Sequence, residues 1–250
     1  MGLSYNGDPE RKPKLVILSG AGLSADSGIA TFRGASGLWE GHSVDQVANG
    51  MTWKRNWDLV RNFYNDRRVA LGTVEPNLMH RAIADWETKY DTVNLTQNVD
   101  DLLERAGCKQ VVHLHGFLPE MCCEACGHVW SVGYSAVSET DRCPGRDGKC
   151  LSIKGTRPNI VFFHEPAPNY SLMYKTFRQL EPQDCVVVIG TSGLVIDVNS
   201  LVFDSPAHKI LNNLEASEHI NESYFDHVLY GTANSQAQTV SQLIAAHMNK

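Results

Sequence analysis

The 250-residue sequence predicts an α/β fold with a mostly parallel, doubly wound sheet. Short apolar runs alternate with helical patterns, and the first run, residues 14–18, leads into a glycine turn at Ser19-Gly20-Ala21-Gly22. The composition is globular, with 42% hydrophobic and 20% charged residues. A chain of this length accommodates one large domain that carries smaller inserted modules.

The expected elements follow in order along the chain. After the strand at 14–18, residues 23–29 can open a helix. Further strands are expected at 93–96, 111–114, 185–189 and 209–214, and helices at 77–90, 100–106, 170–180 and 237–247.

Two segments interrupt the alternation of strands and helices. Residues 43–69 place Trp53, Trp57, Val60 and Phe63 or Tyr64 at helical spacing, whereas residues 117–165 are loop-rich and contain most of the cysteines. We therefore expect a Rossmann-like nucleotide-binding domain formed by residues 1–40, 70–116 and 166–250, a helical module at 41–69 and a zinc-binding module at 117–165.

Charge and hydropathy exclude several classes of partner. The net charge of −6 argues against a nucleic-acid-binding surface, and the longest apolar runs are too short to span a bilayer. Residues 1–14 contain no apolar core, so we expect no signal peptide, no membrane partner and a reducing, cytoplasmic location. We also expect a monomer.

The glycine turn is a candidate dinucleotide site. Gly20-Ala21-Gly22-Leu23-Ser24-Ala25 matches G-x-G-x-x-G/A after a strand, where glycines let the backbone approach a pyrophosphate. An ordinary strand-to-helix turn is the alternative. Residues 31–39 have loop composition and do not form the second strand, ending in an acid, that a dehydrogenase needs. We expect a bound dinucleotide without hydride transfer.

Polar residues follow the expected strand at 93–96. Gln97, Asn98 and Asp100 lie where ligands bind in open α/β sheets, and could hold a carboxamide and ribose hydroxyls. The alternative is a helix N-cap at Asn98 or Asp100.

Two histidines alternate with apolar residues at Val111–His115, so in a strand both rings would share a face. Gly116 is expected to end this strand, which places His115 at the rim as a general base and His113 one pleat deeper in a packed role. Half of a metal site, or two tolerated polar residues, are the alternatives.

Five of the seven cysteines fall within 29 residues, which in a reducing compartment indicates a metal before a disulfide. Cys123 and Cys126 form a C-x₂-C knuckle, and Cys143 with Cys150 completes a four-thiolate zinc site. Cys122 or His128 could replace a ligand, and a redox disulfide is the alternative. No base lies nearby in the sequence, so we expect a structural zinc.

Taken in this order, the motifs resemble those of the sirtuins, the NAD-dependent protein lysine deacylases. The resemblance runs from Lys14 to about Ala245. It depends on Gly20-Ala21-Gly22, Ser24, Ser27-Gly28-Ile29, Thr31-Phe32-Arg33, Thr96-Gln97-Asn98-Val99-Asp100, Arg105-Ala106-Gly107, His115-Gly116, the cysteine module, Arg157-Pro158, Val161-Phe162-Phe163, Gly190-Thr191-Ser192 and Asn213-Leu214-Glu215.

The resemblance implies NAD as co-substrate, an acyl-lysine protein or peptide as partner, and nicotinamide and O-acyl-ADP-ribose as products. His115, Asn98 and Asp100 would be catalytic, with His115 the base on a ribose hydroxyl. The implied NAD-binding residues are Gly20, Ala21, Gly22, Ser24, Thr31, Phe32, Arg33, Trp39, Gln97, Asn98, Val99, Asp100, Gly190, Thr191, Ser192, Asn213, Leu214, Glu215 and Ala233.

Residues 29–33 lack the Pro-Asp of many sirtuins and resemble the bacterial and mitochondrial desuccinylase branch. In that branch a Tyr-x-x-Arg pair, here Tyr64 and Arg67, shares a helix face and implies succinyl- or malonyl-lysine as substrate, with acetyl-lysine also accepted. Val161 and Phe162 would also contact substrate. The alternative is that Tyr64 only continues the apolar stripe and that Arg67-Arg68 is a solvated pair.

The chain departs from the family at both segments that would hold a peptide. His164 stands where sirtuins usually have glycine, and Ile196-Asp197 stands where relatives have Tyr-Pro. An NAD glycohydrolase or a mono-ADP-ribosyltransferase using the same pocket is therefore the alternative function. A catalytically idle NAD sensor is disfavoured because it would not need His115, Asn98 and Asp100 together.

Overall fold

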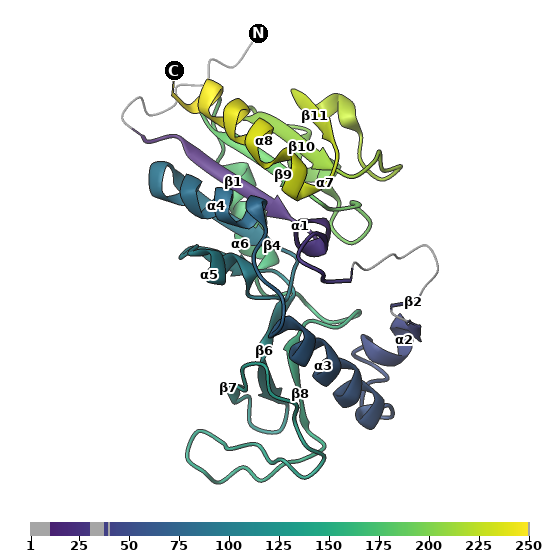
Figure 1. The fold of residues 1–250 in the computed structure, drawn as a ribbon. Helices are drawn as coiled ribbons and strands as arrows, with labels where there is room; N and C mark the ends of the chain where they lie inside the picture. Colours follow the sequence, from purple (N-terminus) through teal and green to yellow (C-terminus); the bar gives the residue numbers. More distant parts are fainter. Residues whose placement is uncertain (1–10, 31–37, 40, 250) are drawn as a thin grey trace.

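The computed structural model describes residues 11–30, 38–39 and 41–249. Its centre is a six-stranded parallel sheet in the order β11-β10-β9-β1-β4-β5 (Figure 1). The strands are β1 (Lys14–Ser19), β4 (Asp91–Thr96), β5 (Val111–His113), β9 (Cys185–Ile189), β10 (His208–Asn213) and β11 (His227–Tyr230). The predicted fold class is confirmed.

Both faces of this sheet are covered by helices. In β1, Leu15 and Ile17 pack with α4 (Leu78–Lys89), α5 (Leu102–Ala106) and α8 (Ala233–Met248). Val16 and Leu18 face the opposite way, toward α6 (Tyr170–Arg178) and α7 (Val198–Val202). Figure 1 shows α4 and α8 side by side on one face. Burial on both faces explains why the strands are continuous apolar runs.

Several predicted boundaries move. The strand expected to reach His115 ends at His113, and α8 begins at Ala233 instead of residue 237 because the Thr232 side chain accepts a hydrogen bond from Ser235 N at 3.2 Å. The sequence analysis missed β11, α7 and the 3₁₀ helix η2 (Glu222–Tyr224), which are only three to five residues long. The helix after the glycine turn, α1, is confined to Gly22–Ala25.

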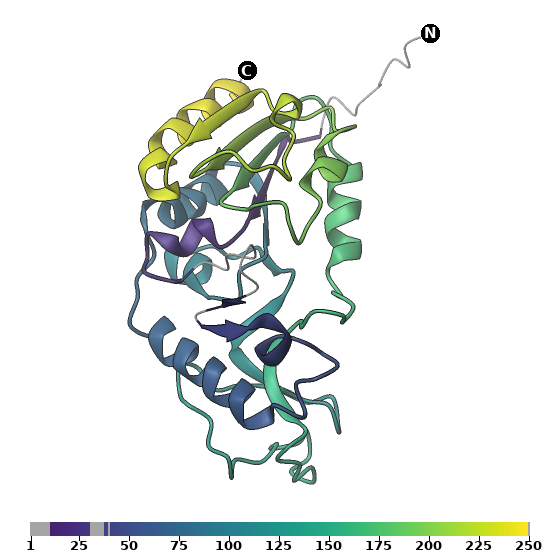
Figure 2. The ribbon, with the colours of Figure 1, turned by 90° about the vertical axis from the view of Figure 1, so that its right-hand side faces the viewer.

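The two inserted segments lie together beyond one edge of the large sheet (Figures 1 and 2). The first contains α2 (Val44–Val47) and α3 (Trp57–Leu71), and β2 (Leu38–Trp39) pairs with β3 (His42–Ser43) next to it. The predicted stripe is buried in one cluster that includes Trp53, Trp57, Val60 and Tyr64.

The cysteine-containing segment is more ordered than its composition predicted. It forms an antiparallel sheet of β6 (Gly116–Cys123), β7 (Val129–Ser131) and β8 (Thr156–Ile160) in the order β7-β6-β8. Pro119 and Pro158 lie within these strands and weaken their sequence signal. Trp57 Nε1 donates to Thr156 O at 3.0 Å, which joins α3 to this sheet. Among the described residues, no helix is long and apolar enough to cross a bilayer.

Candidate active site and metal centre

Polar side chains from the ends of three strands of the large sheet, β4, β9 and β10, bond to one another. Gln97, after β4, donates through Nε2 to Thr191 Oγ1 at 3.0 Å. Thr191, after β9, donates its backbone N–H to Asn213 Oδ1 at 3.1 Å, and Asn213 Nδ2 returns a bond to Thr191 O at 2.9 Å. The structure therefore brings together residues that the sequence analysis placed in one site from three separate segments.

The glycine turn packs directly against the end of β9. Gly22 N donates to Gly190 O at 2.8 Å. A Cβ atom on Gly20 would lie 2.7 Å from Gly190 O, and one on Gly22 would lie 2.6 Å from Gly190 Cα. No side chain fits at these positions, so the turn is built for close approach between backbones, as a pyrophosphate site requires.

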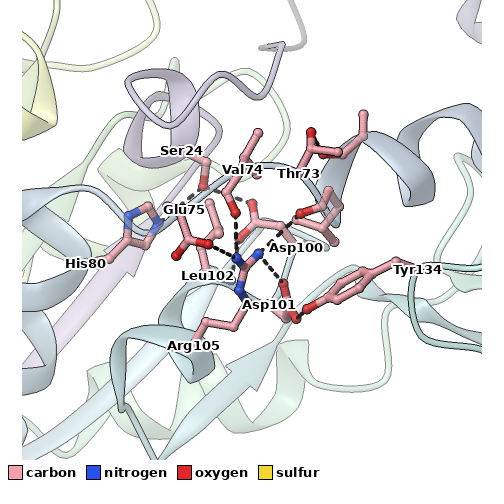
Figure 3. A network of polar contacts seen from close by, with 12 residues as sticks. Ser24, Thr73, Val74, Glu75, His80, Asp100, Asp101, Leu102, Arg105 and Tyr134 are labelled. Atoms are coloured by element: carbon pink, nitrogen blue, oxygen red, sulfur yellow. Dashed lines mark hydrogen bonds and ion pairs between the residues drawn. The ribbon is translucent and has the colours of Figure 1, made fainter.

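Ser24 is the centre of a buried hydrogen-bond network (Figure 3). Its hydroxyl donates to Asp100 Oδ2 at 2.8 Å and accepts from Asn98 Nδ2 at 3.0 Å. His80 Nε2 lies 3.4 Å from the same hydroxyl. Because His80 Nδ1 accepts from Asn77 N, a neutral ring carries its hydrogen on Nε2 and donates it to Ser24.

Asp100 makes the hydrogen bond to the start of α5 that the capping alternative predicts, and a second bond within the Ser24 network. Its Oδ1 accepts from Leu102 N at 3.1 Å at the start of α5, while its Oδ2 belongs to the Ser24 network. Burial raises the pKa of Asp100, and the bonds from Ser24 and Leu102 oppose that shift. Burial lowers the pKa of His80 to about 4, which keeps its ring neutral near pH 7.

The two predicted histidines have different surroundings. His113 is the packed one, with Nδ1 2.9 Å from Asn98 O and Nε2 2.8 Å from Glu104 Oε1. His115 lies beyond the end of β5, with Nδ1 3.1 Å from Gln97 O and Nε2 2.8 Å from Tyr170 Oη. They do not share one strand as expected, because Gly116, at φ +90°, turns the chain into β6.

Burial lowers the pKa of His115, and the bond to Gln97 O acts in the opposite direction. The sequence analysis missed both His80 and Tyr170. Neither belongs to a motif, and their contacts with Ser24 and His115 span 56 and 55 residues of chain.

Arg105 connects the Asp100 segment to the inserted segments (Figure 3). Its guanidinium donates to Leu71 O at 3.2 Å, to Val74 O at 2.5 Å and to Glu75 Oε1 at 3.0 Å. Tyr134, from the segment between β7 and β8, donates its hydroxyl to Asp101. Arg105 stood in a motif without an assigned role, and these bonds give it a structural one.

The four predicted zinc ligands converge. The Sγ atoms of Cys123, Cys126, Cys143 and Cys150 all lie within 4.8 Å of one another, with Cys123–Cys150 at 3.8 Å and Cys126–Cys143 at 3.6 Å. A tetrahedron with Zn–S bonds of about 2.3 Å has edges of about 3.8 Å, so the cluster fits zinc. A disulfide would need about 2.05 Å, and all four cysteines are free thiols.

The two substitute ligands lie elsewhere. Cys122 directs its thiol to Pro158 O at 3.7 Å, and His128 stacks on Trp130. The predicted set of four cysteines, holding a structural zinc, is therefore confirmed.

The predicted acyl-group residues lie on α3. Tyr64 is 1% exposed and stacks on Phe162, with ring centroids 5.8 Å apart. The guanidinium of Arg67 lies 3.2 Å from the centroid of the Phe63 ring and donates to Phe63 O at 2.7 Å. Burial raises the pKa of Tyr64, and the charge of Arg67 acts against that rise.

Part of the alternative interpretation of this helix is correct and part is wrong. Tyr64 does belong to the apolar cluster with Trp57 and Val60. Arg68, however, is not solvated: it is 1% exposed, donates through Nε to Leu118 O at 3.0 Å, and burial lowers its pKa to about 10.

The structure shows the surroundings of His164 and of Ile196-Asp197, the two departures from the sirtuin pattern. His164 has φ +69°, the only positive φ among the described non-glycine residues, so it keeps the left-handed backbone that glycine favours. Asp197 caps α7 by accepting from Ser200 N at 3.2 Å, and Ile196 is buried in the core.

The remaining predicted residues either have few described contacts or lie outside the described residues. Ser192, Leu214 and Glu215 are exposed after their strands, and Ala233 is buried at the start of α8. Val99 O accepts from Leu118 N at 2.8 Å, and Val161 N donates to His115 O at 2.9 Å. Thr31, Phe32 and Arg33 lie outside the described residues, and of Trp39 only the backbone, in β2, is described.

The fold and site define a doubly wound α/β protein of the dinucleotide-binding type that carries a four-cysteine zinc module. The model of the Sir2 family matches residues 20–197, and the chain belongs to this family.

Relatives match it over nearly their whole length. It is 41% identical over 252 residues to an NAD-dependent protein deacylase of Helicobacter hepaticus, covering 92% of this chain and 96% of the relative. It is 38% identical to the NAD-dependent protein deacylase SIR2rp3 of Leishmania major, covering 94% and 98%. A Sir2 homologue–NAD complex is similar in fold, with a TM-score of 0.80 at 31% identity and coverage of 94% and 90%.

Proposed function

We propose that this protein removes succinyl and malonyl groups, and also acetyl groups, from lysine side chains of proteins with consumption of NAD. The broader activity, NAD-dependent protein deacylation, is that of its family and of the curated relatives that match nearly the whole chain. The observation that carries the narrower proposal is the Tyr64–Arg67 pair on α3 beside Phe162.

The surroundings of this pair favour an acidic acyl group. Arg67 supplies a positive charge in a half-buried position, and Tyr64 supplies a phenol among apolar rings. In such surroundings a charge-assisted hydrogen bond to a carboxylate is stronger than in water. Val161, next to Phe162, donates to His115 O at 2.9 Å, so the pair is connected through two residues to the proposed base.

NAD would supply the ribose carbon that accepts the acyl oxygen as nicotinamide leaves. We assign His115 the role of base on a ribose hydroxyl, which requires a neutral ring with a free electron pair on Nε2. The bond from Nδ1 to Gln97 O keeps the ring hydrogen on Nδ1, and the burial of the ring favours the neutral form. Asn98 and Asp100, held by Ser24, would orient the nicotinamide and its ribose.

We assign the rest of the cofactor site to the strand ends. The turn at Gly20–Gly22 and the Gly190–Ser192 segment would hold the pyrophosphate. Asn213 and Glu215 would hold the adenosine ribose, with Leu214 and Ala233 near the adenine. The two bonds between the Asn213 side chain and the Thr191 backbone indicate that Asn213 also fixes the shape of the 190–192 segment.

Nicotinamide release from NAD tests this proposal. It would be measured with no peptide, with an acetyl-lysine peptide and with a succinyl-lysine peptide. We expect release that depends on peptide, with O-acyl-ADP-ribose formed and the succinyl peptide preferred. Release that ignores both peptides would instead support an NAD glycohydrolase.

Substitution of Arg67 sharpens the test. We expect Arg67→Met to lower kcat/KM for the succinyl peptide about 10- to 150-fold, the loss of one charge-assisted bond of about 1.5–3 kcal/mol, and to leave the acetyl peptide nearly unaffected. Arg61→Met on the same helix is the matched control, since Arg61 lies over Trp57 instead. Equal losses on both peptides would remove Arg67 from acyl recognition.

A further inference from the structure

The hydrogen bond between His115 and Tyr170 has no role in the function proposed so far. Tyr170 is the first residue of α6, and its hydroxyl lies 2.8 Å from His115 Nε2, with the ring centroids 5.8 Å apart. This nitrogen is the one that would take up a ribose proton. The contact therefore occupies the position that a ribose hydroxyl must reach.

The direction of this bond follows from the other side of the ring. His115 Nδ1 faces the carbonyl oxygen of Gln97, which can only accept a hydrogen bond, so Nδ1 carries the ring hydrogen. In a neutral ring Nε2 then has an electron pair and no hydrogen, and Tyr170 must be the donor. The two contacts together select the tautomer that a base at Nε2 requires.

Resting on the proposed role of His115 as base, we propose that Tyr170 is a positioning residue. Before NAD binds, it holds His115 neutral with the Nε2 electron pair directed outward, and a ribose hydroxyl then takes the place of the tyrosine hydroxyl. No covalent step is involved, because one donor to Nε2 is exchanged for another.

Few other groups can produce the same effect. The titratable groups on the surrounding segments include His113 and Asp100, Glu104 and Arg105 of α5, and Tyr170, Tyr174, Lys175 and Arg178 of α6. His113 is itself bound to Glu104, and Asp100 to Ser24. The pKa of His115 departs from its usual value through burial and the Gln97 carbonyl, without a contribution from a neighbouring charge.

Tyr170→Phe tests the proposal because it removes the hydroxyl and keeps the ring that packs on the core. A donor to Nε2 stabilises the neutral ring, so its loss raises the pKa of His115 in the free enzyme. We expect a rise of about half a pH unit, measured by NMR titration of the ring nitrogens. Tyr174→Phe makes the same chemical change one turn further along α6 and should leave this pKa unchanged.

The pH dependence of turnover provides a second measurement. The acid limb of kcat/KM reports the free enzyme and should move upward in Tyr170→Phe, whereas the limb of kcat reports the complex, in which Tyr170 is already displaced, and should not move. An unchanged pKa of His115 together with an unchanged kcat/KM profile would overturn the proposal.

Two further experiments separate this inference from the function on which it rests. If His115→Gln keeps full deacylase activity, His115 is not the base and the role on which this inference rests fails, whatever the Tyr170→Phe titration shows, while deacylation itself is retained. With wild-type protein, added ADP-ribose should shift the ¹³Cζ resonance of Tyr170 as its hydroxyl leaves Nε2. No shift at saturating ADP-ribose would show that no exchange occurs and would overturn the inference even if Tyr170→Phe does not fold.

Discussion

The Ser24 network and the cysteine cluster stabilise their regions differently, the first through hydrogen bonds beside a packed sheet and the second through metal binding. Ser24, His80, Asn98 and Asp100 are buried beside a packed parallel sheet, and each is held by a hydrogen bond to another. The four cysteines lie on a hairpin and a long connection, and no helix or strand is described between β7 and β8. The first region needs only the folded sheet, whereas the second needs a metal to hold its loops together.

Zinc removal should produce the largest effect. Structural zinc sites bind with about 10–16 kcal/mol in isolated fingers, so chelation should unfold the loops between β6 and β8 and leave the parallel sheet folded. Hydrogen exchange would show lost protection in residues 123–156 and retained protection in β1, β4 and β9.

Cys122→Ser is the matched control for Cys123→Ser, because Cys122 lies next to the cluster and bonds to Pro158 O instead. Cys122→Ser should keep one zinc per chain, and Cys123→Ser should lose it. Full protection of residues 123–156 in zinc-free protein would show that this region, like the Ser24 network, is ordered without a metal.

Acid should weaken the Ser24 network through His80. The folded pKa of about 4 lies below the unfolded value of 6.5, so this contribution to stability is present above pH 6.5 and is lost as the pH falls toward 4. The shift corresponds to about 3 kcal/mol. The free energy of unfolding, measured with urea from pH 7 to pH 4.5, should fall less steeply with decreasing pH in His80→Gln than in the wild type.

The comparison between variants is needed because acid also protonates the zinc thiolates in both proteins. His219→Gln, which alters an exposed histidine, should keep the wild-type dependence of the unfolding free energy on pH. If His80→Gln also keeps the wild-type pH dependence, protonation of His80 does not contribute to the loss of stability in acid.

Ser24→Ala should have a smaller effect on stability. It leaves Asp100 Oδ2 and Asn98 Nδ2 without their shared partner, at a cost of about 1–3 kcal/mol. Chemical unfolding would measure this loss, with exposed Ser200→Ala as control. The zinc content should remain unchanged, and a variant that lost zinc would show that the two regions are not independent.

The smallest effect is expected at the contact between the regions. Tyr134→Phe removes the bond to Asp101 from a side chain that is 38% exposed, so stability should fall by less than about 1 kcal/mol. Hydrogen exchange in residues 97–101 should nevertheless increase. A change in Tm of many degrees would indicate a tighter connection between the regions than these bonds provide.

The sequence predicted the parts of the molecule whose signal is local. The buried strands are apolar runs, and cysteine spacing was sufficient to select the zinc ligands. The sheet β7-β6-β8 was missed because prolines interrupt two of its strands. His80, Tyr170 and Tyr134 were missed because each acts through a residue at least 33 positions away, and no periodicity or motif predicts such a contact.

The close packing of Gly20, Gly22 and Gly190 has a consequence for reading mutational scans of this protein. A Cβ atom at any of the three would come within 2.7 Å of backbone atoms across the joint between β1 and β9. Alanine at these sites would therefore force two central strands apart and abolish activity, although none of the three glycines has a side chain that acts on the acyl-lysine. In a survey of tolerated substitutions the three glycines would be indistinguishable from reactive residues, and only the amount of folded protein would tell them apart.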